Sequence, residues 1–128
     1  MEHSLSRIEA IALETIAQLP APFAAHARDL VLQVEEMPPD WIVAEMQLED
    51  PLELTGLYDG TPLTEKSIAE PAPMADVVWL FRKPILAELA ERPEVSLAEL
   101  VRHVTIHEIA HHFGWSDDDI AQIDEWWT

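Results

Sequence analysis

The sequence predicts an α+β fold built as one domain over residues 1–128. Two observations predict this class: apolar residues recur at helical spacing near both ends of the chain, and short β-prone apolar runs, punctuated by prolines, occupy the middle. A chain of 128 residues, 48% of them hydrophobic, can bury a core of its own. We therefore expect a small sheet packed on helices.

The first half of the chain predicts one helix followed by short extended segments. Between Leu5 and Leu19 the apolar residues form one helical stripe, and the prolines that follow end it. Residues 30–34 predict a short strand, and residues 41–48 predict one or two helical turns. Residues 52–67 combine a β-prone stretch with a turn pair, which indicates a strand or hairpin and then a loop.

The second half predicts a buried strand and two helices. Residues 76–85 contain five successive apolar residues typical of a buried strand, although spacing leaves open whether that strand is the edge of the sheet. A helical pattern runs over residues 84–90. Ser96 and Glu99 have the form of a capping box, which predicts a helix from Leu97 to Phe113.

Composition and charge exclude several classes of partner. The chain has no cysteine, so a metal must be held by His, Asp or Glu, a donor set that suits zinc. The formal charge of -18 repels phosphate backbones and anionic lipid surfaces, so we expect neither nucleic acid nor membrane as a partner. We interpret the acidity first as a source of solubility, with steering of a cationic peptide as the alternative. Without a signal-peptide pattern or a long apolar run, we expect a cytoplasmic protein; its oligomeric state is left open.

The stretch "TIHEIAHHFGWSDDD" carries the strongest chemical pattern in the chain. On a helix, His107 and His111 lie one turn apart, so their rings can converge on one ion at roughly 2.0–2.1 Å. Glu108 lies beside them, within reach of a water on that ion. A third ligand is needed, and Gly114 can reverse the chain so that the carboxylate of Asp117 returns to the site.

Other residues near this stretch compete for the same roles. His103 lies one turn before His107, but three residues at successive i+4 steps span about 12 Å and cannot share one ion, so we expect His103 at the surface or behind the ligands. His112 points about 100° away from His111 and is expected to pack against its neighbours. The aspartates at 117–119 also suit the start of a last helix, where the macrodipole favours acidic residues.

The spacing HExxHxxGxx followed by a carboxylate resembles the extended zinc signature of metzincin-type peptidases, with aspartate in place of their third histidine. The blocks "LTGLYDGTPLTEKS", "VVWLFRKPIL" and "VTIHEIAHHFGWSDDDI" together resemble a small bacterial family of zincin-like metallopeptidases, over about residues 30–127. Only 17 residues follow His111 and none is methionine, so the Met-turn of the larger metzincins has no counterpart there.

This resemblance implies a minimal zincin-like fold, in which a small mixed sheet packs on an active-site helix flanked by N-terminal and C-terminal helices. It also implies bound Zn²⁺ and a peptide or protein substrate. Carried over position by position, the family pattern makes His107, His111 and Asp117 the zinc ligands and Glu108 the general base. The signature spacing favours Asp117 over Asp118 as the third ligand.

The resulting hypothesis is a zinc-dependent metallopeptidase in which Glu108 takes a proton from the attacking water and passes it to the leaving amine. The alternative is a non-catalytic zincin-like domain that binds zinc and a peptide or protein partner. Tyr58 could donate to the oxyanion, but a packed or loop-anchoring tyrosine is the favoured interpretation.

The five tryptophans admit two interpretations. Those near the C-terminus could form a peptide-binding aromatic patch, but core packing is favoured for them and for the two earlier in the chain. The tryptophans are Trp41, Trp79, Trp115, Trp126 and Trp127.

Overall fold

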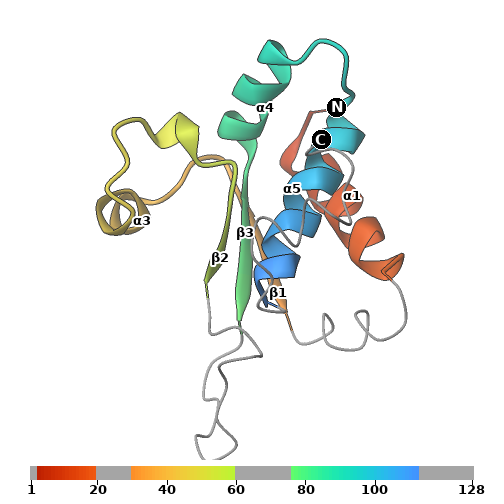
Figure 1. Cartoon of the computed structure of the whole chain (residues 1–128), viewed down its shortest axis with the longest axis horizontal. Helices are drawn as coiled ribbons and strands as arrows, with labels where there is room; N and C mark the ends of the chain where they lie inside the picture. The colour runs from red at the N-terminus through yellow and green to blue at the C-terminus, as the bar shows by residue number, and fades with distance from the viewer. Residues whose placement is uncertain (1–2, 20–29, 60–75, 113–128) are drawn as a thin grey trace, which may run out of the picture.

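A computed structural model describes residues 3–19, 30–59 and 76–112 of the chain. Within these ranges a helix comes first, a mixed run of strands and helices follows, and a long helix comes after it, as the sequence predicts, and the α+β class is confirmed (Figure 1). The elements in chain order are α1 (Leu5–Ala17), β1 (Val31–Glu35), α3 (Asp40–Glu45), the 3₁₀ turn η1 (Pro51–Glu53), β2 (Gly56–Asp59), β3 (Val77–Phe81), α4 (Arg82–Glu91) and α5 (Leu97–His112).

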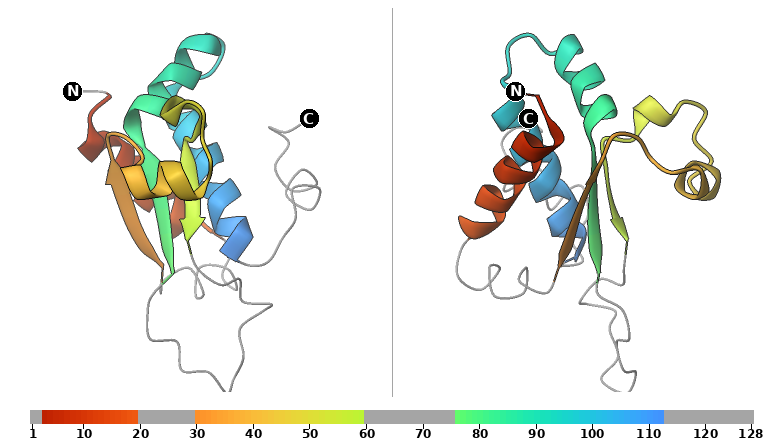
Figure 2. Two further views of the ribbon diagram at one scale, coloured as in Figure 1. Left: turned by 90° about the vertical axis from the view of Figure 1, so that its left-hand side faces the viewer. Right: turned by 180° about the vertical axis from the view of Figure 1, so that it is seen from behind.

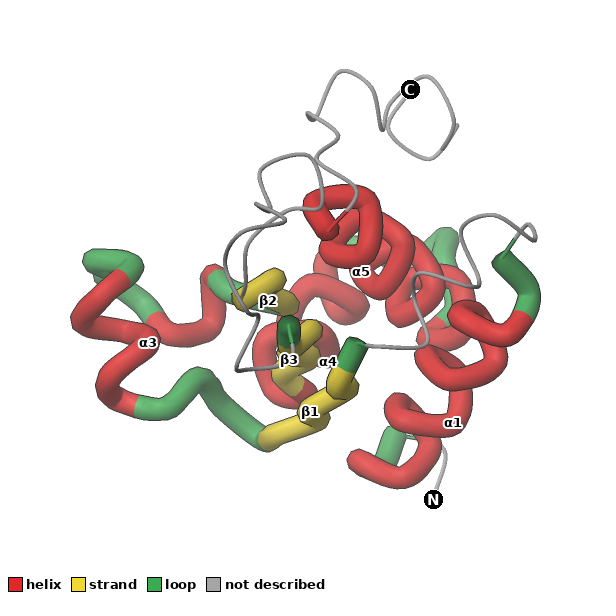
Figure 3. Tube along the Cα trace, turned by 90° about the horizontal axis from the view of Figure 1, so that it is seen from below, coloured by secondary structure: helices red, strands yellow, loops and turns green. Residues whose placement is uncertain are grey.

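The described strands form one mixed sheet with the order β1-β3-β2. β1 runs parallel to β3, with Val31 opposite Val77, and β2 runs antiparallel to β3, with Gly56 opposite Leu80. The strand at residues 77–81, whose place the sequence left open, is therefore the central one. Within the described part of the chain, β2 is an outer strand, and it lies on the side of the sheet nearer α5 (Figure 3).

The sheet separates two unequal layers. α1 and α5 lie against each other and cover one face, whereas α3 and η1 lie on the other side of the sheet (Figures 1 and 2). The side chains of Val78 and Leu80 alternate with Trp79 along β3 and enter the main core between the sheet and the two helices. That core consists of Ile8, Ile11, Ala12, Val78, Leu80, Ile85, Leu97, Leu100, Val101, Val104 and Ile109.

Side-chain caps fix where the two long helices begin. The Ser4 hydroxyl accepts a hydrogen bond from the Arg7 amide at 3.1 Å at the start of α1. At the start of α5 the Ser96 hydroxyl accepts from the Glu99 amide at 3.1 Å, while the Glu99 carboxylate accepts from the Ser96 amide at 3.4 Å. This reciprocal pair confirms the predicted capping box, which sets the register of the helix that carries the histidine motif.

The buried strand predicted from the five apolar residues of segment 76–85 is confirmed as β3, Val77–Phe81. Two other predicted boundaries are wrong. α4 begins at Arg82, before the proline from which we expected it to start. Pro84 is tolerated there because the amides of the first helical turn have no partner within the helix. The segment expected to be extended from residue 52 begins instead with η1, where the Asp50 carboxylate accepts from the Leu52 amide at 3.0 Å.

The two described tryptophans do not share one environment. Trp79 is partly buried and stacks on Phe81 with ring centroids 6.0 Å apart, and it meets Trp41 edge-on at the same separation. Trp41 itself is 51% exposed, so the prediction that it packs in the core is wrong. The remaining tryptophans and the predicted last helix lie outside the described residues. None of the helices described here has the length and apolar character needed to cross a membrane.

Candidate active site

The two motif histidines on α5 face each other at the separation that one shared metal ion requires. The Nε2 atoms of His107 and His111 are 3.2 Å apart, and their rings meet edge to face with centroids 4.9 Å apart. Two bonds of roughly 2.05 Å at a tetrahedral angle place the ligating nitrogens about 3.3 Å apart. The same distance suits a hydrogen bond in which one neutral ring donates to the other. The imidazole pair therefore fits zinc without a change of helix geometry.

The third predicted ligand, Asp117, and the glycine that would turn the chain toward it lie outside the described residues. Within the described ranges no three His, Asp or Glu side chains converge on one point that could hold a metal. The assignment of Asp117 therefore stays a prediction.

Glu108 lies where α5 passes unusually close to the edge strand β2. The contact is made at Gly56: a Cβ added there would lie 2.8 Å from Cγ1 of Val104 and 3.3 Å from Cγ of Glu108. It would also lie 3.1 Å from the carbonyl oxygen of Trp79 on the neighbouring strand. Only a residue without a side chain permits this approach. Because residue 56 is a glycine, the edge of β2 can lie next to Glu108, the expected general base.

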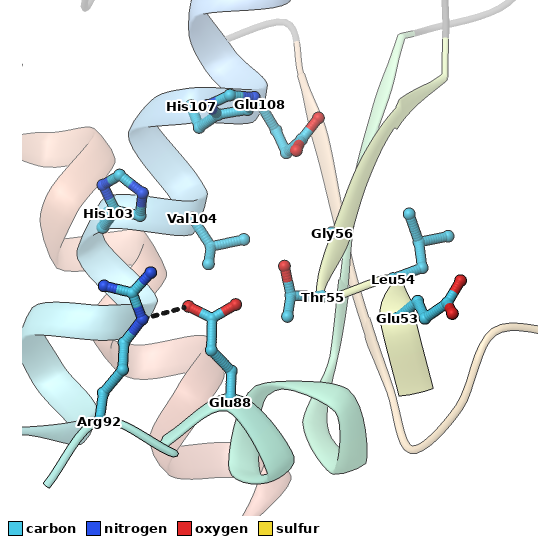
Figure 4. Close-up of a pocket in the computed structure, with 10 residues that line it drawn as sticks. All are labelled: Glu53, Leu54, Thr55, Gly56, Glu88, Arg92, His103, Val104, His107 and Glu108. Carbon is cyan, nitrogen blue, oxygen red and sulfur yellow. Dashed lines mark ion pairs between the residues drawn. The ribbon is translucent and has the colours of Figure 1, made fainter. Parts of the chain in front are cut away.

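A cavity of about 250 Å³ runs from the motif along α5 toward the start of that helix. His107 and Glu108 lie at one end, and the ion pair of Glu88 with Arg92 lies at the other (Figure 4). The residues that line it are Glu53, Leu54, Thr55, Gly56, Glu88, Arg92, His103, Val104, His107 and Glu108. α5, α4 and the segment from η1 to β2 thus line one continuous space.

His103 is buried, with 9% of its surface exposed, so of the two positions expected for it the one at the surface does not occur. Its ring centroid lies 6.4 Å from that of His107, one helical turn away, and it lines the cavity below the motif. This placement agrees with the geometric argument that His103 lies behind the ligand pair.

Tyr58 is a packed and anchored residue, as the favoured interpretation predicts. Its ring packs against the main core, and its hydroxyl donates to Oδ2 of Asp76 at 2.8 Å. Burial, together with this bond and the charge of Asp76, raises the pKa of Tyr58 well above its ordinary value of 10.0. The bond joins β2 to the residue just before β3.

The family follows from the extent of the match along the chain. The sequence profile of the zincin-like metallopeptidases matches residues 27–127. The chain belongs to this family. A minimal zincin-like fold is consistent with what the described residues show, a three-stranded mixed sheet beside the helix that carries the motif. No curated protein matches the chain.

Sequence reasoning missed the residues that shape the rest of this zincin-like site. Gly56 and the cavity residues Glu53, Glu88 and Arg92 carry no local pattern that marks them. Gly56 does fall inside one of the blocks that resemble the family, and this was the one available signal. The others become neighbours of the motif only through the tertiary fold.

Proposed function

We propose that this zincin-like protein is a zinc-dependent peptidase, with His107, His111 and Asp117 as the metal ligands and Glu108 as the general base. The observation that carries the proposal is the 3.2 Å separation of the two histidine Nε2 atoms, which matches a shared tetrahedral ion. The family match and the cavity beside Glu108 support the enzyme class.

The residues of the chain divide the work of amide hydrolysis among them. A bound zinc ion would supply Lewis-acid polarisation of the scissile carbonyl and would make water a better nucleophile near neutral pH. Glu108, which lines the cavity where β2 approaches α5, accepts the proton of the attacking water. It then donates that proton to the nitrogen of the departing amine.

The outer edge of β2 is the surface on which we propose that the substrate lies. Among the described strands β2 pairs with β3 alone, and its first residue, Gly56, is packed against the helix beside Glu108. An extended peptide added along this edge would form main-chain hydrogen bonds and place a carbonyl near the base. We propose peptides or unfolded protein segments as the substrate class.

Metal content measured together with peptide cleavage tests the proposal. Purified protein should hold close to one zinc per chain, and Glu108→Gln should keep the zinc while cleavage of a peptide library falls by at least about a hundredfold. Asp117→Ala should lose zinc, whereas the matched control Asp118→Ala should retain it. The opposite result for these two variants would overturn the ligand assignment. Wild-type protein that holds zinc and cleaves no peptide would favour the non-catalytic alternative.

A further inference from the structure

The central strand β3 is apolar on both of its faces. Its five residues, VVWLF, form the continuous apolar run that is typical of a strand buried on both sides. On the side of α1 and α5 this burial is complete, since Val78 is 1% exposed and Leu80 is 0% exposed. On the other side Phe81 is fully buried, whereas Val77 and Trp79 stay partly exposed. The described residues therefore cover that second face only in part.

The partly covered face continues across the two outer strands. In register, Val31 of β1 lies beside Val77, and Leu57 of β2 lies beside Trp79. Because side chains alternate along a strand, these four residues share one face of the sheet. Trp41 of α3 extends it, since its ring meets that of Trp79 edge-on. Val31 and Trp41 are 42% and 51% exposed, and Figure 2 (left) shows α3 crossing only the upper part of the strands. We call this contiguous apolar surface the open face.

Two carboxylates lie at opposite ends of the open face. Glu35 ends β1 and Asp59 ends β2, and these strands run in opposite directions. Their register with β3 places both on the open face, and both are exposed. The three strands and α3 contain no lysine or arginine. Arg82, which follows β3, is paired with Glu36 at 3.1 Å. The open face is therefore apolar in its middle, with carboxylates at its margin.

We propose that the open face binds a helix of a partner protein, one whose apolar stripe is flanked by lysine or arginine side chains. Helices are the elements that cover an apolar sheet face, as α1 and α5 cover the opposite face of this sheet. An exposed apolar patch with a polar rim is typical of a protein interaction site. Carboxylates at its two ends favour cations at the matching ends of the partner. The inference does not depend on the peptidase function, because the open face lies on the side of the sheet away from α5.

Charge distinguishes this occupant from two others. A second copy of the chain would bring together two formal charges of -18 and set carboxylates against carboxylates. Residues 1–2, 20–29, 60–75 and 113–128 of the same chain contain Arg28 and Lys66 as their lysine and arginine residues, and carboxylates outnumber them. A basic partner helix is the occupant whose charge complements the margin of the open face.

A single cysteine reports whether the open face is accessible in the free protein. The chain has no cysteine, so Val31→Cys places one thiol on the open face, and Leu13→Cys, at a position 50% exposed on α1, is the matched control. We expect the two thiols to react with a maleimide at rates within roughly threefold of each other. Protection of Val31→Cys at every protein concentration would assign the open face to the chain's own residues. Protection that grows with protein concentration would assign it to a second copy, and either result would overturn the proposal.

A designed peptide then supplies the proposed chemistry. Its leucines recur at helical spacing with lysines on both sides of the stripe, and a second peptide has glutamate in place of each lysine. At a concentration of about ten times its Kd, the lysine peptide should slow the labelling of Val31→Cys roughly tenfold and leave Leu13→Cys unaffected. Protection of both thiols or of neither, or equal protection by the two peptides, would overturn the proposal.

Substitutions locate the binding energy on the open face. With the Kd of the lysine peptide measured by fluorescence anisotropy, Trp41→Gln should raise it roughly tenfold and Asp59→Asn about two- to threefold. Leu13→Gln and Glu9→Gln, which remove an exposed apolar side chain and an exposed carboxylate from α1, should leave it unchanged. Circular dichroism verifies the fold of each variant. Equal effects of the two pairs of substitutions, with the fold intact, would show attraction by overall charge alone and would overturn the proposal.

Discussion

Gly56→Ala should destabilise the protein because it places a methyl group in a space that α5 already fills. The added Cβ would lie 2.8 Å from Cγ1 of Val104, closer than real Cβ contacts allow. Val104 is 5% exposed, and a β-branched residue in a helix has one strongly preferred rotamer, so this contact cannot be relieved by a simple side-chain rotation. The carbonyl oxygen of Trp79, at 3.1 Å, belongs to the central strand and is equally fixed. Strand β2 must therefore move away from the helix.

The magnitude follows from two opposing effects. Overpacking a well-filled core costs about 1–3 kcal/mol. Replacing glycine by alanine at a backbone conformation that alanine tolerates recovers about 0.4–1 kcal/mol, because the unfolded chain loses freedom. The net loss in the free energy of unfolding should be about 1–2 kcal/mol, or roughly 4–8 °C in Tm for a chain of this size. Urea denaturation at neutral pH measures it.

A double-mutant cycle isolates the contact itself. Val104→Ala removes the atom that the new methyl group strikes, so Gly56→Ala should cost less in that background, with a coupling energy of about 1 kcal/mol. Because β2 would also move away from Glu108, Gly56→Ala should reduce peptide cleavage while the zinc content stays near one per chain. If Gly56→Ala is more stable than the wild type, the overpacking argument is refuted, because only the reduced freedom of the unfolded chain would then affect stability.

Two further predictions concern other elements. Ser96→Ala removes the side-chain half of the capping box and should lower the free energy of unfolding by about 1 kcal/mol in urea denaturation; no change would mean that the cap is not needed to start α5. Tyr58 is the one tyrosine of the chain, so tyrosinate absorbance reports it alone. Its folded pKa is raised above the unfolded value, so the stability it provides is fully present below about pH 10 and is lost as the pH rises further. The folded protein should show little tyrosinate at a pH where the urea-unfolded chain is ionised, and coincident titration curves would contradict the buried hydrogen bond to Asp76.

The parts of the site that the sequence predicted are those that depend on neighbours along the chain. The capping box, the helix after it and the convergence of His107 with His111 all follow from spacings of three or four residues. The same local geometry predicts that His103 is not a ligand. It left open whether His103 lies at the surface or behind the pair, because burial of His103 depends on which elements pack over that turn of α5.

Strand order and cavity walls could not be predicted in this way. Nothing within residues 77–81 shows that two strands flank them, because the partners are supplied by segments far away in the chain. Trp41 illustrates the same limit: its size predicted burial, but α3 lies on the less covered face of the sheet, where about half of the residue's surface stays exposed. The early start of α4 has a local cause instead: the first helical turn accepts a proline, so the helix can begin at Arg82, before Pro84.

This division between local and long-range features has a functional consequence for a zincin of this size. The spacing of His107 and His111, the proposed zinc ligands, is set by one helix, whose register is fixed by its own cap. The position of Glu108, the proposed base, depends instead on how closely β2 approaches that helix at Gly56. Zinc affinity and turnover should therefore respond to substitutions in different elements: zinc affinity to those within α5, and turnover also to those in β2.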